Sequence, residues 1–409
     1  MDFLWVLSWL GIVLLTGFLL LAVWAVYYHI SQTEIPPGIS QPLQLRFLHC
    51  LLIMAFALAH ILKKLHICTD YKLLRFFMDG IPPLKDPQLS IKNLSFDGIP
   101  VRMYQPRGSC DGGWRGIIYF HGGIGLYGSI DAYERMCRAI AKESNSLLVS
   151  VGYRLAPEHP YPAQFEDCLT AATYFMKNVR KYGVNPALII VSGDSSGGTI
   201  AASVCQHLVT KPDLPKVRAQ ILIYPYLQAV DFNLPSYQRN SHVPIFYQEQ
   251  VVEFGIQYLQ KDMSLVKEIL GGFHIPQEIK LKYRKWLGSE NLPKEFQLER
   301  YRLPQPSSDS TRGYEEIKMI FETILSPLLA EDAVVQQLPE TYILTCEYDV
   351  FLDDGIMYKK RLEDNGVPVT WYQLQDGFHG VLIFLNNFIF SFSGSQKGLN
   401  SIVNFIKSL

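Results

Sequence analysis

A six-residue turn, Gly193-Asp194-Ser195-Ser196-Gly197-Gly198, constrains the fold of this chain more than any other feature. The continuous apolar run 187–191 before it predicts a buried strand, and the small, apolar stretch 199–208 after it predicts a helix. Glycines flank the serine where a Cβ atom would obstruct a tight turn. The pattern Gly-x-Ser-x-Gly between a strand and a helix therefore predicts a sharp turn that exposes the hydroxyl of Ser195 at a sheet edge.

Length and composition favour one large folded core with additions. The chain has 409 residues, of which 48% are hydrophobic and 13% aromatic. A formal net charge of -1 gives no electrostatic reason to expect a nucleic-acid partner. The seven cysteines have scattered spacings that match neither a disulfide framework nor a zinc site.

The N-terminal segment 1–30 is expected to be a transmembrane signal-anchor. The segment from Phe3 to Ile30 contains no Lys, Arg, Asp or Glu. It is long enough to span a bilayer as a helix. A cleaved signal peptide is the alternative, but the basic n-region is missing and the apolar run exceeds the usual ~7–15 residues. Aromatic residues lie near both ends, as in membrane interfaces: Trp5, Trp9, Trp24, Tyr27 and Tyr28.

Residues 31–95 are expected to form a membrane-proximal and cap segment. A second apolar stretch, Phe47–Leu62, has sixteen residues and is followed by two lysines. That is short for a membrane span, so burial against the folded domain or a position in the membrane interface is favoured, with a second span as the alternative. Asn93 begins an Asn-x-Ser glycosylation sequon, which matters if this part of the chain faces a secretory lumen.

Apolar strands alternate with helices over residues 96–409. This rhythm predicts an α/β domain with a mostly parallel sheet covered on both faces. Residues 231–330 interrupt it with Pro, aromatic and charged clusters and are expected to form a helical cap inserted over the site. The expected strands are 99–104, 116–120, 147–151, 187–191, 219–224, 341–345 and 369–374.

A serine nucleophile needs a base and an orienting acid, and in chains with this kind of turn they follow in the order Ser, Asp or Glu, His. His379 lies in a glycine-flanked loop after the last expected strand. In contrast, His207 lies in the helix expected after the serine turn, and His242 and His274 lie in the expected cap. We therefore expect His379 to be the base.

The acid is expected to follow the strand 341–345. Asp349 comes first in the loop at the carboxyl end of that strand, where catalytic residues gather in open α/β sheets. Asp353 and Asp354 fit better as the N-terminal residues of the next helix, and Glu347 is the remaining competitor. Asp349 is the expected acid.

The oxyanion hole is expected from two backbone segments. Ser196, directly after the nucleophile, would supply one N–H group. The strand 116–120 runs into His121-Gly122-Gly123, and Gly122 and Gly123 would supply the others. The site then needs no metal and no organic cofactor.

Several ordered motifs together resemble the hormone-sensitive-lipase branch of the α/β-hydrolases, and within it the arylacetamide deacetylase-like group. The resemblance extends over nearly the whole chain. The motifs that carry it are His121–Gly123, Tyr153–Pro160, Gly193–Gly198, Leu222–Pro225, Ser326–Ala330, Asp349–Gly355 and Asp376–Gly380.

The resemblance implies an enzyme that hydrolyses carboxylic esters, including lipid esters, and arylacetamides through an acyl-serine intermediate. It assigns the nucleophile to Ser195, the acid to Asp349 and the base to His379. It also implies that His121, Gly122 and Gly123 form the oxyanion motif. It also implies a single-pass type II membrane protein of the endoplasmic reticulum, with a lumenal catalytic domain and an accessible Asn93. Its partners would be a small-molecule or lipid ester and the membrane.

One departure from the family pattern supports an alternative function. The oxyanion motif usually has a third glycine followed by an aromatic residue, whereas this chain has Ile124 and Gly125. A β-branched side chain restricts the backbone there, so Ile124 could narrow the acyl pocket or tilt a donor. The alternative is a catalytically impaired, membrane-anchored lipid-binding or scaffold protein.

Overall fold

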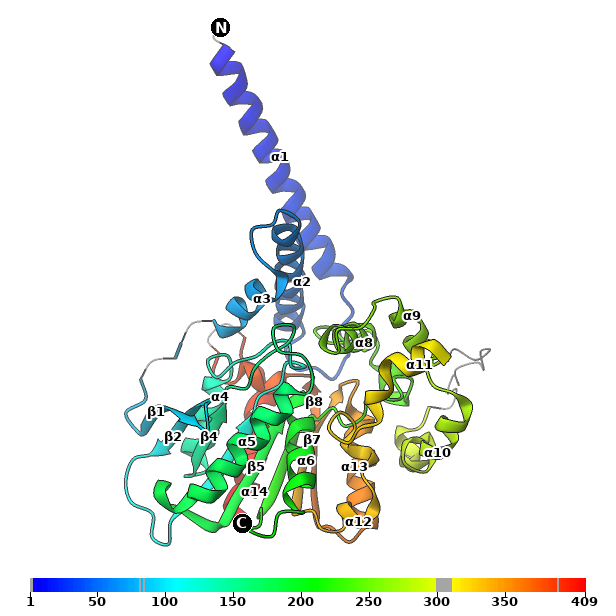
Figure 1. Ribbon diagram of the computed structural model, residues 1–409. Helices are drawn as coiled ribbons and strands as arrows, with labels where there is room; N and C mark the ends of the chain where they lie inside the picture. The colour runs from blue at the N-terminus through cyan, green and yellow to red at the C-terminus, as the bar shows by residue number, and fades with distance from the viewer. Residues whose placement is uncertain (1–2, 81, 84, 299–310, 388–389) are drawn as a thin grey trace.

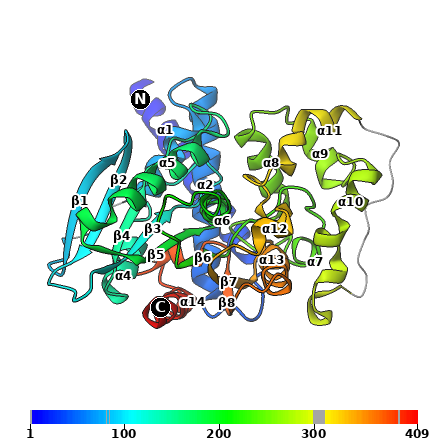
Figure 2. The same cartoon turned by 60° about the horizontal axis from the view of Figure 1, so that its bottom comes forward.

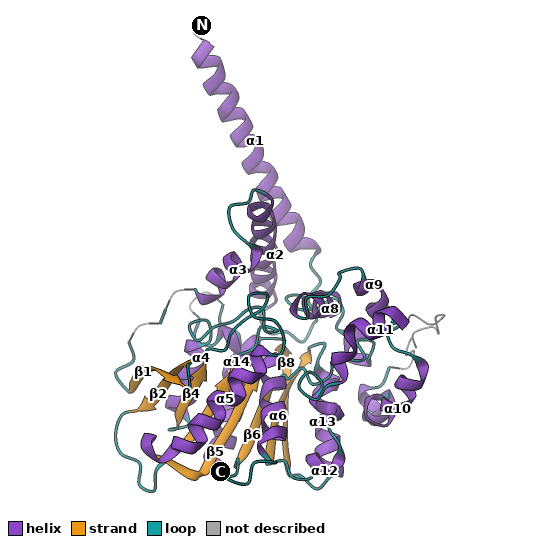
Figure 3. Cartoon of the chain, viewed as in Figure 1, coloured by secondary structure: helices purple, strands orange, loops and turns teal. Residues whose placement is uncertain are grey.

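A single eight-stranded sheet forms the centre of the molecule (Figures 1 and 3). The computed structural model describes residues 3–80, 82–83, 85–298, 311–387 and 390–409. The strands lie in the order β1-β2-β4-β3-β5-β6-β7-β8. Their bounds are β1 Leu89–Phe96, β2 Ile99–Pro106, β3 Trp114–Phe120, β4 Leu147–Val151, β5 Val184–Asp194, β6 Ala219–Ile223, β7 Glu340–Tyr348 and β8 Val369–Phe378.

The sheet is mostly parallel, which confirms the expected fold class. Only the pairs β1/β2 and β2/β4 are antiparallel, and the strands from β4 to β8 pair in parallel. The edge strand β1 lies before the expected domain start at residue 96, so the sheet begins at Leu89. In β1 only Leu89 and Phe96 are buried, and the residues between them are partly or fully exposed. Its sequence therefore lacks the mostly apolar run by which the other strands were predicted.

Helices cover both faces of the sheet, as Figure 2 shows. One apolar cluster lies under α5, α6 and α13, and a second lies under α4 and α14. The bounds are α4 Glu134–Glu143, α5 Ala163–Asn178, α6 Ser196–Leu208, α13 Leu352–Asp364 and α14 Ser393–Ser408. Short 3₁₀ turns are Val179–Tyr182, Ser289–Asn291, Lys294–Phe296, Lys318–Phe321, Pro327–Leu329 and Val381–Phe384.

The connection between the neighbouring strands β6 and β7 is long and helical. It contains the expected cap interval 231–330, of which residues 299–310 lie outside the described residues. In Figure 1 most of its helices group beyond the β7–β8 side of the sheet. They are α7 Pro235–Arg239, α8 Gln248–Tyr258, α9 Leu265–Leu270, α10 Gln277–Leu287, α11 Thr311–Ile317 and α12 Asp332–Val335.

Three helices precede the sheet: α1 (Phe3–Gln32), α2 (Pro42–Lys64) and α3 (Asp70–Asp79). Figure 1 shows α1 as a long helix that projects away from the sheet. The expectation that the second apolar stretch is short changes, because α2 has 23 residues and contains an 18-residue window with a mean hydropathy of 2.0, so by length and composition it could cross a membrane. The sixteen-residue count left out residues 42–46 at the start of this helix and the two lysines at its end.

One face of α2 nevertheless belongs to the folded domain. Leu45 and Leu48 are buried in the apolar cluster that lies under α4 and α14, and Ala59 packs with α3 and with Leu126. Phe56 stacks on Phe254 of α8 at 6.1 Å between ring centroids. These contacts fix α2 against the domain along its length.

Candidate active site

The nucleophile elbow is a strained turn between β5 and α6. Ser195 alone separates the two elements and has φ +53°, a conformation that side chains rarely adopt. A Cβ atom on Gly193 would lie 2.1 Å from the carbonyl oxygen of Gly197, and one on Gly197 would lie 2.2 Å from that of Phe120. Only glycine fits at these two positions, so the sequence forces this turn.

Three side chains from separate parts of the chain meet at the elbow. His379 is the first residue after β8, and its Nε2 lies 2.9 Å from Ser195 Oγ. Its Nδ1 lies 2.8 Å from Oδ2 of Asp349, the first residue after β7. An ionised carboxylate only accepts hydrogen bonds, so Nδ1 carries the proton and Nε2 is free to accept the Ser195 proton.

The packing around His379 holds this tautomer and ring orientation. Asp349 is 1% exposed, and its second oxygen accepts the backbone N–H of Phe351 at 2.9 Å. The ring of His379 stacks on Phe246, with 4.7 Å between centroids, and meets the ring of Phe351 edge-on at 4.9 Å. Phe246 belongs to the 231–330 segment, so that segment covers the base.

The three other histidines considered as the base, His207, His242 and His274, have different surroundings. His207 Nδ1 lies 2.9 Å from the carbonyl oxygen of Ser203 in the preceding turn of α6. His274 is buried, its Nε2 lies 3.1 Å from the carbonyl oxygen of Val230, and burial lowers its pKa to about 4. His242 lines a separate surface hollow.

The competing carboxylates also have other partners. Glu347 accepts a hydrogen bond from the side chain of Gln373. Asp353 and Asp354 lie in the first turn of α13, as expected, and accept the backbone N–H groups of Ser236 and Leu227 at 2.7 and 3.0 Å. They fasten the chain that follows β6, up to the start of the 231–330 segment, to α13. Burial raises the pKa of both.

The loop after β3 holds its histidine below the site. His121 is 1% exposed, with its ring stacked on Tyr153 at 4.2 Å between centroids. Its Nδ1 lies 2.8 Å from the carbonyl oxygen of Gly122, and burial lowers its pKa to about 4. His121 is therefore neutral at pH 7, and its side chain contacts the loop backbone and Tyr153.

The backbone donors of this loop differ from the expectation. The N–H of Gly122 donates to Asp194 Oδ1 at 2.9 Å, so the expected oxyanion role of this group is corrected. The N–H of Ile124 donates to Ser196 Oγ at 2.8 Å. Within the described part of the chain, no acceptor pairs with the N–H of Gly123 or of Ser196.

Two glycine-like conformations shape the loop. Gly123 has φ +109°, and a Cβ there would lie 2.4 Å from the carbonyl oxygen of Tyr127. Ile124 has φ +58°, which is costly for a β-branched residue. The family pattern has its third glycine at this position, and the isoleucine of this chain adopts a positive φ there at the expense of strain.

Asp194 is a site residue that the sequence reasoning did not single out. Its carboxylate is fully buried and accepts the hydroxyl of Tyr119 at 2.6 Å and the N–H of Gly122 at 2.9 Å. Burial raises the pKa of Asp194 to about 6, and these hydrogen bonds oppose the rise. An aspartate directly before the nucleophile, in a turn otherwise made of glycine and serine, was the available signal.

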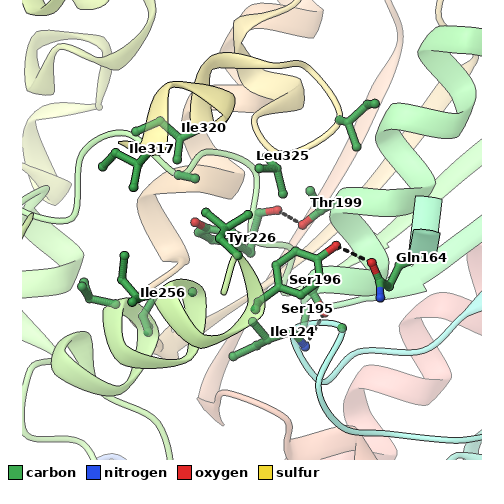
Figure 4. A pocket seen from close by; sticks show the side chains of 18 of the residues that line it. Ile124, Gln164, Ser195, Ser196, Thr199, Tyr226, Ile256, Ile317, Ile320 and Leu325 are labelled. Atoms are coloured by element: carbon green, nitrogen blue, oxygen red, sulfur yellow. Dashed lines mark hydrogen bonds between the residues drawn. The ribbon is translucent and has the colours of Figure 1, made fainter. Parts of the chain in front are cut away.

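An apolar pocket opens beside Ser195 (Figure 4). Its wall comes from the loop after β3, from α5, α6, α8 and α9, and from the loop after β6. Residues 317–325 and Phe351 complete it. Among its polar lining groups, Gln164 is bonded to the hydroxyl of Tyr258 at 3.0 Å, and Thr199 donates to the carbonyl oxygen of Tyr226. The wall therefore offers mainly hydrocarbon to a bound group.

Helix α3 supports the loop from outside. The guanidinium of Arg75 donates to the carbonyl oxygens of Leu126 and Ala156 at 2.8 and 2.5 Å, and pairs with Glu158 at 2.9 Å. The 153–160 motif is thereby joined to the 121–126 loop.

Asn93, the residue of the glycosylation sequon, lies apart from the site on edge strand β1. Its side chain is exposed, and its Oδ1 accepts a hydrogen bond from Arg102 at 2.7 Å.

Among the described residues, no group of three or more His, Cys, Asp and Glu side chains has an arrangement that could hold a metal ion. The seven cysteines are free thiols.

Comparisons with known proteins show the family of this chain. A family model described as "alpha/beta hydrolase fold" matches residues 117–269 and 311–383. Arylacetamide deacetylase-like 4 from Homo sapiens is 43% identical over 392 residues, which covers 96% of each chain. Arylacetamide deacetylase from Bos taurus is 37% identical and covers 90% of this chain and 94% of its own.

Solved structures support the fold. The chain described as DphMB1 is 25% identical with a TM-score of 0.62, and the match covers 83% of this chain and 91% of that one. EstE1, a thermostable carboxylesterase from a metagenomic library, is 24% identical with a TM-score of 0.61, covering 83% and 97%.

Proposed function

Because the chain belongs to the arylacetamide deacetylase-like group of the α/β-hydrolase family, we propose that it is a membrane-anchored serine hydrolase that cleaves carboxylic esters. The observation that carries the proposal is the continuous hydrogen-bonded series Ser195 Oγ, His379 and Asp349, with distances of 2.9 and 2.8 Å. A chance arrangement would not also place the serine in a strained elbow beside an apolar pocket.

The proposed reaction is acyl transfer through Ser195. His379 Nε2 takes the hydroxyl proton while Ser195 Oγ attacks the ester carbonyl carbon, and the imidazolium then gives that proton to the leaving alcohol. Asp349 holds the imidazole and stabilises its charged form. Water, activated in turn by His379, attacks the acyl-serine and releases the acid.

The oxyanion donors in this proposal are the N–H groups of Gly123 and Ser196. Both lie next to the elbow, and both lack an acceptor within the described chain. Ser196 is the first residue of α6, so the positive end of the helix dipole adds to the stabilisation. Gly122 instead holds the loop in place through Asp194.

The substrate class follows from the pocket wall. Hydrocarbon side chains such as Phe165, Ile200 and Val252 line it, which favours an ester with an apolar acyl or aryl group, including lipid esters. Arylacetamides are the second proposed class, because related chains carry the name arylacetamide deacetylase. An ester chain-length series compared with an aryl acetamide distinguishes the two.

We further propose that α1 anchors the protein as a single-pass type II membrane protein, with the catalytic domain in the lumen of the endoplasmic reticulum. At 1.5 Å per residue, its 30 residues extend about 45 Å, enough to cross a bilayer. The outer face of α2 and α3 would then rest in the membrane interface and admit substrate from it. Exposed apolar side chains there are Leu43, Phe47, Leu51, Ile53, Met54, Leu58, Ile61, Leu65, Ile67, Phe76, Phe77 and Met78.

The domain division is proposed accordingly. Residues 1–30 form the anchor, the sheet domain begins at Leu89 instead of 96, and 231–330 form the cap, in which Phe246 and α8 cover the site. A lumenal domain makes Asn93 available for glycosylation. A mobility shift on enzymatic deglycosylation, lost in Asn93→Gln, is the expected result, and an unchanged mobility in the wild-type protein contradicts lumenal exposure of this site.

A fluorophosphonate probe tests the hydrolase proposal. The wild-type protein is expected to be labelled and Ser195→Ala is not, because only an activated serine attacks the phosphorus centre. Equal labelling of the two proteins would overturn the proposal. The rival non-catalytic function rests on Ile124 alone, and the bonded triad favours the enzyme.

A further inference from the structure

Ser196, the residue after the nucleophile, has its side chain in the wall of the apolar pocket. Ser196 lines the same pocket as Ser195 and Ile124 (Figure 4). Its Oγ accepts the backbone N–H of Ile124 at 2.8 Å. The hydroxyl thus lies in the wall of the pocket and is bonded to the loop that follows β3.

A hydroxyl group has one proton to donate as well as two lone pairs. For Ser196 one lone pair is used by Ile124, but among the described residues no acceptor takes the hydroxyl proton. The surrounding pocket wall is mainly hydrocarbon, with Ile200 and Val252 among its members. Ser196 is half-buried, so this proton is available to an acceptor that enters the pocket.

The other hydroxyl groups near the elbow differ in this respect. Thr199 also lines the pocket, but its hydroxyl donates to the carbonyl oxygen of Tyr226. Ser203, on the same helix, donates to the carbonyl oxygens of Thr323 and Ile324 at 2.8 and 3.1 Å. Ser196 is therefore set apart from them by a proton that remains available.

We propose that the hydroxyl of Ser196 is a side-chain donor to the oxyanion, and that it connects the Ile124 N–H to that charge. This role rests on the proposed function. When Ser195 Oγ bonds to the carbonyl carbon, the carbonyl π pair moves onto oxygen, and His379 holds the serine proton. The new O⁻ accepts three hydrogen bonds: from the Gly123 N–H, the Ser196 N–H and the Ser196 O–H.

The tetrahedral adduct then collapses in the usual balanced way. The electron pair returns from O⁻ to reform the carbonyl, the bond to the alcohol oxygen breaks, and His379 gives that oxygen its proton. Because Ile124 donates to Ser196 Oγ, the Ser196 O–H is polarised and is a stronger donor than an isolated hydroxyl. The strained backbone of Ile124 thereby contributes to catalysis through Ser196.

The test compares Ser196→Ala with the wild-type protein on an oxygen ester and on its thionoester, whose sulfur is a poor hydrogen-bond acceptor. Loss of one oxyanion donor lowers kcat by about 10²-fold, so this fall is expected on the oxygen ester with little change in KM. On the thionoester the fall is expected to be much smaller. Binding of a trifluoromethyl ketone, which forms the same O⁻, is expected to weaken in parallel.

Ser203→Ala is the matched control, because it removes a buried hydroxyl from the same helix whose proton is already donated. It is expected to leave the ratio of oxygen-ester to thionoester turnover unchanged. Unchanged or increased oxygen-ester turnover in Ser196→Ala would overturn the inference, since the hydroxyl would then be idle or would block the Ile124 donor. An equal fall on both substrates would also overturn it, as a structural effect.

A different result would contradict the proposed hydrolase function itself. If the wild-type protein neither turns over the oxygen ester nor reacts with a fluorophosphonate, the hydrolase itself is contradicted. If the wild-type protein is active and Ser196→Ala equals it, only the role of the Ser196 hydroxyl is contradicted.

Discussion

Two walls of the site flank Ser195 and are built in different ways. On one side, His379 and Asp349 are side chains that follow the ends of neighbouring strands, and each makes a single well-directed hydrogen bond toward the serine. On the other side, the 121–125 loop presents backbone N–H groups, two of which are already bonded to Asp194 and Ser196.

This comparison shows which property of the chain each wall depends on. The triad wall depends on the chemical identity of its side chains, because another residue type cannot transfer or hold the proton. The loop wall depends on backbone conformation, because any residue has an N–H but few tolerate the dihedral angles. Substitutions should therefore separate the walls: changes of chemistry act on the first, and changes of shape act on the second.

The largest effect is expected on the triad wall. Asp349→Asn keeps the shape but favours the wrong imidazole tautomer, so kcat should fall about 10⁴-fold in an ester-turnover assay. Asp353→Asn is the control, because this buried carboxylate binds a backbone N–H of Ser236 and not His379. A comparable loss in Asp353→Asn, or none in Asp349→Asn, contradicts the assignment of the acid.

A change of shape in the loop should have the next largest effect. In Gly123→Ala the new Cβ would lie 2.4 Å from the Tyr127 carbonyl oxygen, so the loop must move and lose a donor. We expect kcat to fall about 10²–10³-fold with normal folding by circular dichroism. Gly394→Ala, where the nearest atom is at an ordinary 3.4 Å, should retain full activity.

Asp194 links the two walls electrostatically. In Asp194→Asn the loop keeps an acceptor but loses its charge, and we expect about a tenfold fall in kcat/KM at pH 8, since bonds to charged acceptors are roughly 1–2 kcal/mol stronger. The Asp194 pKa is about 6, so below that pH the wild-type residue is protonated and resembles the amide.

The ratio of wild-type to variant kcat/KM should accordingly fall toward one as the pH drops from 8 to 5. A ratio that stays constant with pH would show that the Asp194 charge does not support the loop.

The smallest effect is expected at Ile124. Ile124→Gly adopts φ +58° without strain and removes a side chain from the pocket, so activity should shift a few-fold toward bulkier acyl esters. Ile200→Val shortens another lining residue outside the loop and should give a weaker shift. An unchanged acyl preference in Ile124→Gly would remove this residue from the account of specificity.

The same contrast explains what the sequence could predict. Seven strands were located from continuous apolar runs, and Ser195, Asp349 and His379 were selected from chain order and loop position. The direction of an N–H is a property of dihedral angles, so the sequence could not reveal that Gly122 donates to Asp194 or Ile124 to Ser196. The edge strand β1 and the full length of α2 were missed because polar residues interrupt their apolar patterns.

The covalent intermediate gives the most direct test of the central claim, that Ser195 is an activated nucleophile. Rapid mixing with a p-nitrophenyl ester, followed by acid quench and peptide mass spectrometry, should give a burst approaching one p-nitrophenolate per protein and an acyl mass on the peptide containing Ser195. His379→Ala should give neither. Steady turnover with the acyl group on another residue, or on none, would contradict the account.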